Sequence, residues 1–175
     1  MLIIDAERTR SSLSFDQLVP ALKTAFCEPV EVPLRHNHNI APDSESPGCM
    51  LLMPAWNQQG FLGIKTVTIY PQNASKGLPG LHSTYMLHNA ETGAPLALID
   101  GNEITSRRTA AASALAASFL SRPDANSLLV VGAGRVASLL AYAFASVRPI
   151  RQVAVWDINP AQPASLVEQL QRHGF

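Results

Sequence analysis

The sequence predicts an α/β protein: an N-terminal mixed α+β domain followed by the first elements of a buried parallel β-α-β unit. Three observations predict this class. Strand-like runs separated by turn residues fill the segment 50–99. A long run of Ala, Ser and Leu follows at residues 104–120 and predicts a helix. Beyond residue 126, two short apolar runs flank a glycine turn and an apolar helical segment, which is typical of parallel strands.

Composition limits the classes of function. The 175 residues include 13 Lys and Arg and 13 Asp and Glu, so the formal net charge is zero. Without a basic surplus we expect no nucleic-acid partner and no anionic membrane partner. Hydrophobic residues make up 47% and charged residues 15%, which favours a folded core over disorder. No run approaches the roughly 18 apolar residues of a membrane span, so a cytoplasmic protein is expected.

The N-terminal elements are predicted from spacing and turn residues. Ser14 and Gln17 resemble a capping box, and apolar residues then recur at helical spacing, so a helix is expected over residues 14–27 with Pro20 bending or shortening it. Residues 29–48 indicate a strand or loop of mixed exposure. Short or turn-like links between the strands that follow favour an antiparallel or mixed sheet. Those strands are expected at residues 50–54, 61–69, 83–88 and 95–99.

A domain boundary is expected after the alanine-rich helix, because Arg-Pro-Asp-Ala-Asn at residues 122–126 breaks its pattern. The domains are therefore predicted as residues 1–122 and 123–175. The second begins with a strand at 128–131, a helix at 136–145, a strand at 153–156 and a helix after Pro160.

The glycine turn carries the most specific chemistry. Gly132-x-Gly134-x-x-Ala137 follows an apolar strand and opens a helix, and Asp157 stands at the end of the next strand. Such a turn lets backbone amides approach a pyrophosphate at the positive end of the helix. A carboxylate at Asp157 would accept hydrogen bonds from ribose hydroxyls and repel a 2′-phosphate, which favours NAD, with NADP as the alternative. An ordinary glycine turn, and an Asp157 that caps the segment before Asn159, are the competing interpretations.

Two cationic side chains are candidates for binding an anion. Lys65 lies on an apolar, β-branched strand, where an ammonium without a partner costs free energy. It is a candidate for holding a carboxylate or activating a reacting group; the alternative is an edge-strand lysine that reaches solvent. Arg108 lies in the first turns of the alanine-rich helix, where the helix dipole favours an anion. Its neighbour Arg107 is expected to be a solvated surface residue, because two adjacent helical residues face different ways.

No metal site is expected. Cys27 and Cys49 have no zinc-ligand or disulfide-framework spacing around them. His36 and His38 alternate as on a strand but lack a third ligand, so they are interpreted as polar surface or as pocket lining near Arg35.

Together these blocks resemble the ornithine cyclodeaminase and mu-crystallin family from about residue 35 to the end. The resemblance rests on Lys65, the glycine turn, Tyr-Pro-x-Asn at 70–73, Gly-Leu-Pro at 77–79, Thr-Gly-x-Pro-x-Ala-Leu-x-Asp-Gly at 92–101 and Thr-x-x-Arg-Thr-Ala-Ala at 105–111. It implies a substrate-binding and dimerisation domain over residues 1–122, a partial Rossmann NAD(P)-binding domain (β-α-β-α only) over residues 123–175, and a homodimer.

The activity implied by the resemblance is that of an NAD(P)-dependent enzyme of amino-acid metabolism. The first expectation is conversion of L-ornithine to L-proline and ammonia through an imine. Reduction of cyclic ketimines such as pyrroline-2-carboxylate, or alanine dehydrogenation, is the alternative enzymatic activity. From other classes, a mu-crystallin-like ligand-binding protein and an inactive truncated remnant are also considered.

Site roles also follow from the resemblance, position by position. Arg35 and Arg108 resemble the pair that holds the substrate α-carboxylate, and Lys65 resembles the lysine beside the reacting carbon. Cofactor-phosphate contacts are implied for Thr109, Gly132, Gly134, Arg135 and Val136, and a ribose contact for Asp157. The family's Rossmann domain continues into further strands and a catalytic aspartate. The resemblance therefore implies a C-terminally truncated member with an exposed parallel edge.

Overall fold

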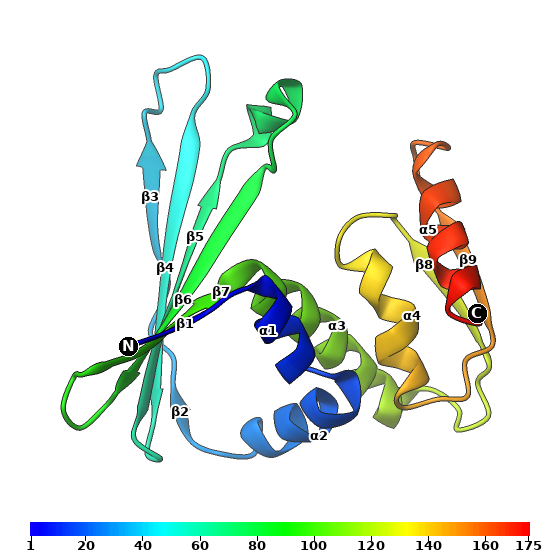
Figure 1. The fold of residues 1–175 in the computed structure, drawn as a ribbon, viewed down its shortest axis with the longest axis horizontal. Coiled ribbons are helices and arrows are strands. Elements are labelled where there is room, and N and C mark those ends of the chain that lie inside the picture. Colours follow the sequence, from blue (N-terminus) through cyan, green and yellow to red (C-terminus); the bar gives the residue numbers. More distant parts are fainter. The chain divides into compact units, whose positions relative to one another are not determined.

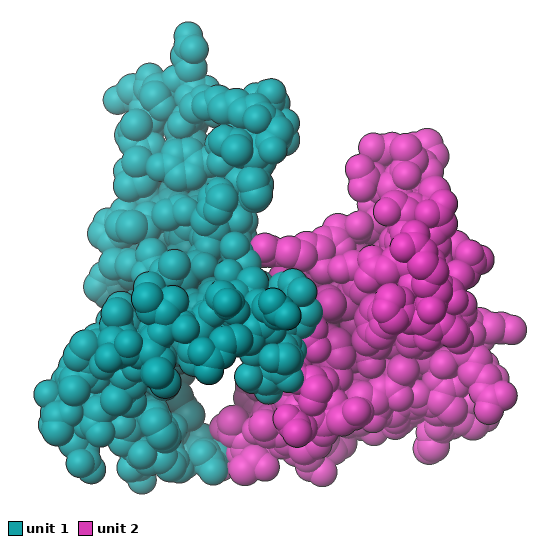
Figure 2. Space-filling view, in the orientation of Figure 1, with its two compact units in different colours: residues 1–12, 28–105 teal, residues 13–27, 106–175 magenta.

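The computed structural model describes residues 1–175, which form a mixed α/β protein, as predicted (Figure 1). The chain divides into two compact units: residues 1–12 with 28–105, and residues 13–27 with 106–175 (Figure 2). This division falls inside the helix α3 (Gly101–Leu120). The domain boundary between residues 122 and 123 stays a prediction.

The first unit is built on a seven-stranded sheet. Its strand order is β1-β7-β6-β5-β4-β2, and β3 pairs with β4 outside this path. β1 is parallel to β7 and every other pair is antiparallel, so the mixed sheet expected from the strand links is present. The strands are β1 (Leu2–Ile4), β2 (Val30–Glu31), β3 (His36–Ile40), β4 (Gly48–Asn57), β5 (Phe61–Ile69), β6 (Leu81–Asn89) and β7 (Pro95–Asp100).

Strand β4 is longer than the predicted 50–54, because Pro54 does not end it. On one side Pro54 pairs with Ile64 of β5. On the other side β3 pairs with β4 only as far as Leu52, and β2 pairs only from Trp56 onward. Pro54 thus lies in the gap between two short neighbours, where its missing N–H removes no ladder hydrogen bond.

The loop between β5 and β6 explains two of the sequence motifs. It contains a 3-10 helix, η1 (Pro71–Lys76), that ends at Gly77 with φ +66°. The Asn73 side-chain amide donates to Pro79 O at 2.9 Å, and Tyr70 N donates to Gly80 O at 2.8 Å. Tyr-Pro-x-Asn and Gly-Leu-Pro are therefore the two sides of one closed loop, and the left-handed position at its centre favours glycine.

The N-terminal helix prediction needs correction. Residues 6–12 form α1 (Ala6–Ser12), and the expected helix over 14–27 is α2 (Phe15–Ala25). Ser14 is the N-cap residue but its side chain makes no cap hydrogen bond, so the capping box is wrong; its carbonyl accepts from Leu18 N at 2.8 Å. Pro20 lies inside α2, which continues to Ala25.

The second unit contains α2, most of α3 and the predicted β-α-β-α series. The series is β8 (Ser127–Val131), α4 (Ala137–Ala145), β9 (Gln152–Trp156) and α5 (Gln162–Arg172), with β8 and β9 parallel (Figure 1). Three alanines of α3 with no exposed surface, Ala110, Ala111 and Ala114, pack with Phe15 and Ala143 in one core cluster. Their small side chains let α2, α3 and α4 approach closely. None of the helices is long and apolar enough to cross a lipid bilayer.

The C-terminal end of α3 is closed by Arg148. Its Nη2 donates to the carbonyls of Ala117, Ser118 and Ser121 at 3.1, 2.8 and 2.9 Å. Its Nε donates to Ser121 Oγ at 2.9 Å. Carbonyls at a helix end lack intrahelical donors, and a cation there also interacts favourably with the dipole. Arg148 therefore joins the segment after α4 to the end of α3.

Replacing Arg148 tests this arrangement. We expect Arg148→Ala to lower the free energy of unfolding by about 2 kcal/mol, because hydrogen bonds from a charged donor are lost at a partly buried helix end. Arg148→Lys should lose most of the same free energy, since an ammonium lacks the planar fork. Urea denaturation measures both, with the exposed Arg151→Ala as the control. An Arg148→Ala chain as stable as the control would contradict the assignment.

Candidate functional site

The glycine turn connects β8 to α4 and is tied to the neighbouring strand. Gly132 has φ +100°, a conformation that favours glycine, and its N–H donates to Trp156 O at 2.7 Å. This bond extends the β8–β9 ladder by one step beyond the strands. At Gly134 an added Cβ would meet no atom within 4 Å, so the space above this glycine is open.

The start of α4 has the properties of an anion-binding helix terminus. Val136 is its N-cap residue and makes no side-chain cap hydrogen bond, and the first turn holds no acidic residue. The first amides of a helix have no intrahelical acceptor, and the helix dipole is positive at this end. Ser138 N already donates to Gly134 O at 3.1 Å and Leu139 N to Val136 O at 3.0 Å, so the amides that can serve a ligand are those that precede Ser138. Together with the open space above Gly134, these amides fit the pyrophosphate of a dinucleotide.

Asp157 follows β9 directly and lies against the same turn. Its Oδ2 accepts from Ala133 N at 2.7 Å, and its Oδ1 accepts from Asn159 N at 2.8 Å. The bond from Asn159 N is the local contact that we expect if Asp157 caps the segment before Asn159. Its role as a ribose contact stays a prediction. Gly132, Gly134, Arg135, Val136 and Asp157 are thus gathered around one turn, as their spacing predicted.

On α3 the two adjacent arginines are arranged in the predicted opposite directions, but the expectation for Arg107 is wrong. Arg107 is 9% exposed; its Nε donates to Leu13 O at 2.7 Å and its guanidinium lies 4.6 Å from the centre of the Phe15 ring. It is buried because the Leu13 carbonyl, just before α2, supplies an acceptor and Phe15 of α2 supplies an aromatic face. Arg108 and Thr109 are exposed, so both side chains are accessible to a ligand.

Lys65 lies in the first unit on β5, between Met53 of β4 and Tyr85 of β6. β5 is paired on both sides, so the alternative of an edge-strand lysine is wrong. Lys65 is partly buried, and it shares a sheet face with Gly63 and Tyr85. Arg35, the other candidate in this unit, is exposed in the segment between β2 and β3.

Tyr85 covers Gly63 on the face that carries Lys65. A Cβ added to Gly63 would collide with the Tyr85 hydroxyl and ring, so the hydroxyl end of the ring occupies the space beside the glycine. Burial raises the pKa of the Tyr85 hydroxyl above its usual value.

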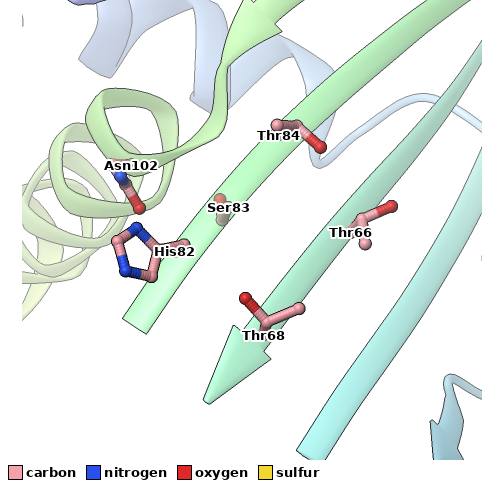
Figure 3. A pocket seen from close by; sticks show the side chains of 6 residues that line it. All are labelled: Thr66, Thr68, His82, Ser83, Thr84 and Asn102. Atoms are coloured by element: carbon pink, nitrogen blue, oxygen red, sulfur yellow. The ribbon is translucent and has the colours of Figure 1, made fainter. Parts of the chain in front are cut away.

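A pocket of about 270 Å³ in the first unit was not indicated by the sequence analysis (Figure 3). None of the predicted site residues is among those that line this pocket. Alternating threonines on β5 were the available sequence signal. The lining residues are Thr66, Thr68, His82, Ser83, Thr84 and Asn102.

The histidines and cysteines do not form a metal cluster. No group of three or more His, Cys, Asp and Glu side chains is placed to hold a metal ion. Cys27 and Cys49 are both free thiols, and Cys49 Sγ donates to Asn37 Oδ1 at 2.9 Å. His36 and His38 stack on β3 with ring centres 6.4 Å apart.

Comparison with known proteins gives a consistent result. A family model described as the ornithine cyclodeaminase/mu-crystallin family matches residues 1–175. A Δ(1)-pyrroline-2-carboxylate reductase of Colwellia psychrerythraea is 43% identical over 95% of this chain and 53% of its own length. The chain therefore spans about half the length of the curated relatives it matches.

Solved structures agree with this result. The Thermococcus litoralis Δ(1)-pyrroline-2-carboxylate reductase, in complex with NADH and L-proline, has a TM-score of 0.88 and 33% identity, covering 99% of this chain and 54% of that one. An archaeal alanine dehydrogenase dimer with bound NAD has a TM-score of 0.85 and 29% identity, covering 100% of this chain and 54% of that one.

The Gly63 and Tyr85 contact can be tested by substitution. We expect Gly63→Ala to lower the free energy of unfolding by about 1–3 kcal/mol, because the methyl group forces the ring out of its place. Adding Tyr85→Val should recover part of this loss and give a favourable coupling energy in a double-mutant cycle. Gly134→Ala, where a Cβ meets no atom within 4 Å, is the stability control. Additive effects of the two substitutions would contradict the contact.

Proposed function

The chain belongs to the ornithine cyclodeaminase/mu-crystallin family, and from this membership we propose that it forms the substrate-binding part and the first half of the NAD-binding part of a cyclic imino-acid reductase. Its substrate would be of the Δ(1)-pyrroline-2-carboxylate class. The observation that carries this proposal is 43% identity to the Colwellia reductase across 95% of the chain. The family's cyclodeamination of ornithine is the second candidate, because it also passes through an imine next to a carboxylate.

NADH is the proposed cofactor, and it supplies the hydride when bound. The first amides of α4 and the side chains of Arg135 and Thr109 are proposed to hold its phosphates, and Asp157 its ribose. Three features of the chain support this: the open space above Gly134, the amides that precede Ser138 at the start of α4 and the carboxylate at the end of β9.

Three cationic side chains are proposed to handle the substrate. Arg35 and Arg108 are exposed, and we propose that both bind the substrate carboxylate, since a guanidinium matches a carboxylate with two parallel hydrogen bonds. Lys65 is proposed to manage the proton at the imine nitrogen, because its ammonium carries three N–H donors on a flexible stem. Fixing the carboxylate fixes the adjacent imine carbon, which is the atom that is reduced.

We further propose that the first unit associates with a second copy through the sheet face opposite Lys65. Four of its buried strand residues, Gly63, Val67, Ser83 and Ala97, lie on the Lys65 face, and one, Gly48, lies on the other. The opposite face carries partly exposed apolar side chains, among them Leu52, Trp56, Ile64 and Met86. A structural neighbour is a dimer, which supports a second copy as the occupant of this face. A cytoplasmic location is proposed from the two free thiols.

Sedimentation equilibrium tests the proposed dimer. The chain should sediment as a dimer, and Met86→Glu should convert it to a monomer because a charge is placed in an apolar interface. Val32→Glu, at a residue 71% exposed outside the sheet, is the matched control. If the chain is still a monomer at about 100 times the lowest protein concentration that the sedimentation experiment detects, the proposal is refuted.

Activity can be tested in a chimaera in which residues 1–175 replace the matching segment of the Colwellia reductase. We expect NADH-dependent reduction of pyrroline-2-carboxylate, and a loss of at least about 100-fold in kcat/KM for Arg108→Ala or Lys65→Ala, because each removes an ionic contact with the reacting group. Arg35→Ala should raise KM. A chimaera that deaminates ornithine with NAD but does not reduce the imine would favour the second candidate instead.

Gly134→Ala separates cofactor binding from stability. The substitution should leave the unfolding midpoint unchanged, because a Cβ meets no atom within 4 Å. It should weaken NADH binding by about tenfold or more, since a methyl group would occupy the space through which the pyrophosphate reaches the amides. Gly80→Ala, where a Cβ also fits, is the control for binding by calorimetry. Unchanged NADH affinity in Gly134→Ala would contradict the proposed cofactor site.

A further inference from the structure

We propose that Asp157 is the positioning residue of the glycine turn: its carboxylate holds the Ala133 amide and thereby sets the conformation in which the turn meets a dinucleotide. This inference rests on the proposed binding of NADH and adds a second task to the ribose contact predicted for the same residue.

Two successive amides of the turn are bonded to two successive residues at the end of β9. Gly132 N donates to Trp156 O at 2.7 Å, and Ala133 N donates to Asp157 Oδ2 at 2.7 Å. The first bond joins backbone to backbone and survives any side-chain substitution. The second depends entirely on the Asp157 side chain, so a substitution of this residue removes the bond to Ala133 N and leaves the bond from Gly132 N in place.

The carboxylate is itself held in place. Its Oδ1 accepts from Asn159 N at 2.8 Å, and Asn159 Oδ1 accepts from Ala161 N at 3.1 Å. Asp157 and Asn159 thus form two consecutive Asx turns, which orient the segment after β9. Asp157 is in none of the ion pairs of the chain, so its negative charge is directed at backbone N–H groups. A carboxylate that accepts from backbone amides makes a stronger bond than a neutral acceptor.

The two tasks are compatible, because each carboxylate oxygen has a second lone pair that can accept from a ribose hydroxyl. They nevertheless predict a distinctive specificity. A residue that only reads the ribose, when replaced by alanine, weakens NADH binding but leaves or improves NADPH binding. When a residue that also positions the turn is replaced by alanine, NADPH gains from the loss of repulsion but still binds more weakly than NADH binds to the unmodified chain, because the pyrophosphate site is common to the two dinucleotides.

The first arm of the test needs no cofactor. Amide hydrogen exchange followed by NMR is measured on the 175-residue chain and its Asp157→Ala and Asp157→Asn variants. In Asp157→Ala the Ala133 amide should exchange about tenfold faster or more, as expected for the loss of a charge-assisted hydrogen bond. Asp157→Asn keeps an oxygen acceptor and should retain part of the protection. Asp124→Ala, an exposed acid of the same unit, is the control.

The buried Ala111 amide of α3 reports global unfolding in each variant. Unchanged exchange at Ala133 in Asp157→Ala, with Ala111 still protected, would overturn the proposal. If Asp157→Ala unfolds, Asp157→Asn decides: Ala133 exchange equal to that of Asp124→Ala would show that the charge contributes nothing, and faster exchange would support the positioning role.

The second arm measures dissociation constants for NADH and NADPH. Asp157→Ala should weaken NADH binding by about tenfold or more, and it should bind NADPH about tenfold or more weakly than the unmodified chain binds NADH. NADPH binding by Asp157→Ala that is as tight as NADH binding by the unmodified chain would overturn the proposal and leave Asp157 as a reader of ribose alone. If the unmodified chain binds neither dinucleotide, the proposed function fails, and the exchange result still decides whether Asp157 positions the turn.

Discussion

The hydrogen bonds that tie the glycine turn to the end of β9 are the constraint on which the candidate cofactor site depends. Gly132 and Ala133 donate to Trp156 and Asp157, and these bonds fix the path of the chain into α4. The open space above Gly134 and the amides at the start of α4 can contribute to one binding site only in that conformation. If the chain left the turn in another direction, the same residues would not lie around one binding site.

Packing between helices of the second unit supports α4, the helix that follows this turn. Ala110, Ala111 and Ala114 of α3 have no exposed surface, and their small side chains allow close contact with Ala143 of α4. Arg148, shortly after α4, closes the C-terminal end of α3. The alanine-rich segment is thus a rigid support for α4, whose first amides are proposed to bind the phosphates.

Local patterns predicted much of this fold, and long-range contacts account for what they missed. The glycine turn, β5 and the small-residue helix follow from spacing and turn residues within a few positions. The burial of Arg107 depends on Leu13 and Phe15, which are distant in sequence and supply its acceptor and ring contact. The position of Lys65 on a central strand depends on the order of strands, which short-range periodicity does not encode.

The central claim is that a dinucleotide is recognised at the turn between β8 and α4, and a titration of the 175-residue chain with NADH tests it most directly. Backbone amide NMR signals are followed during the titration. The account predicts that the largest saturable shifts fall on Gly134, Arg135 and Val136, with smaller shifts at Asp157. Absence of saturable shifts at the turn, or shifts confined to the threonine-lined pocket around Thr66, would contradict it.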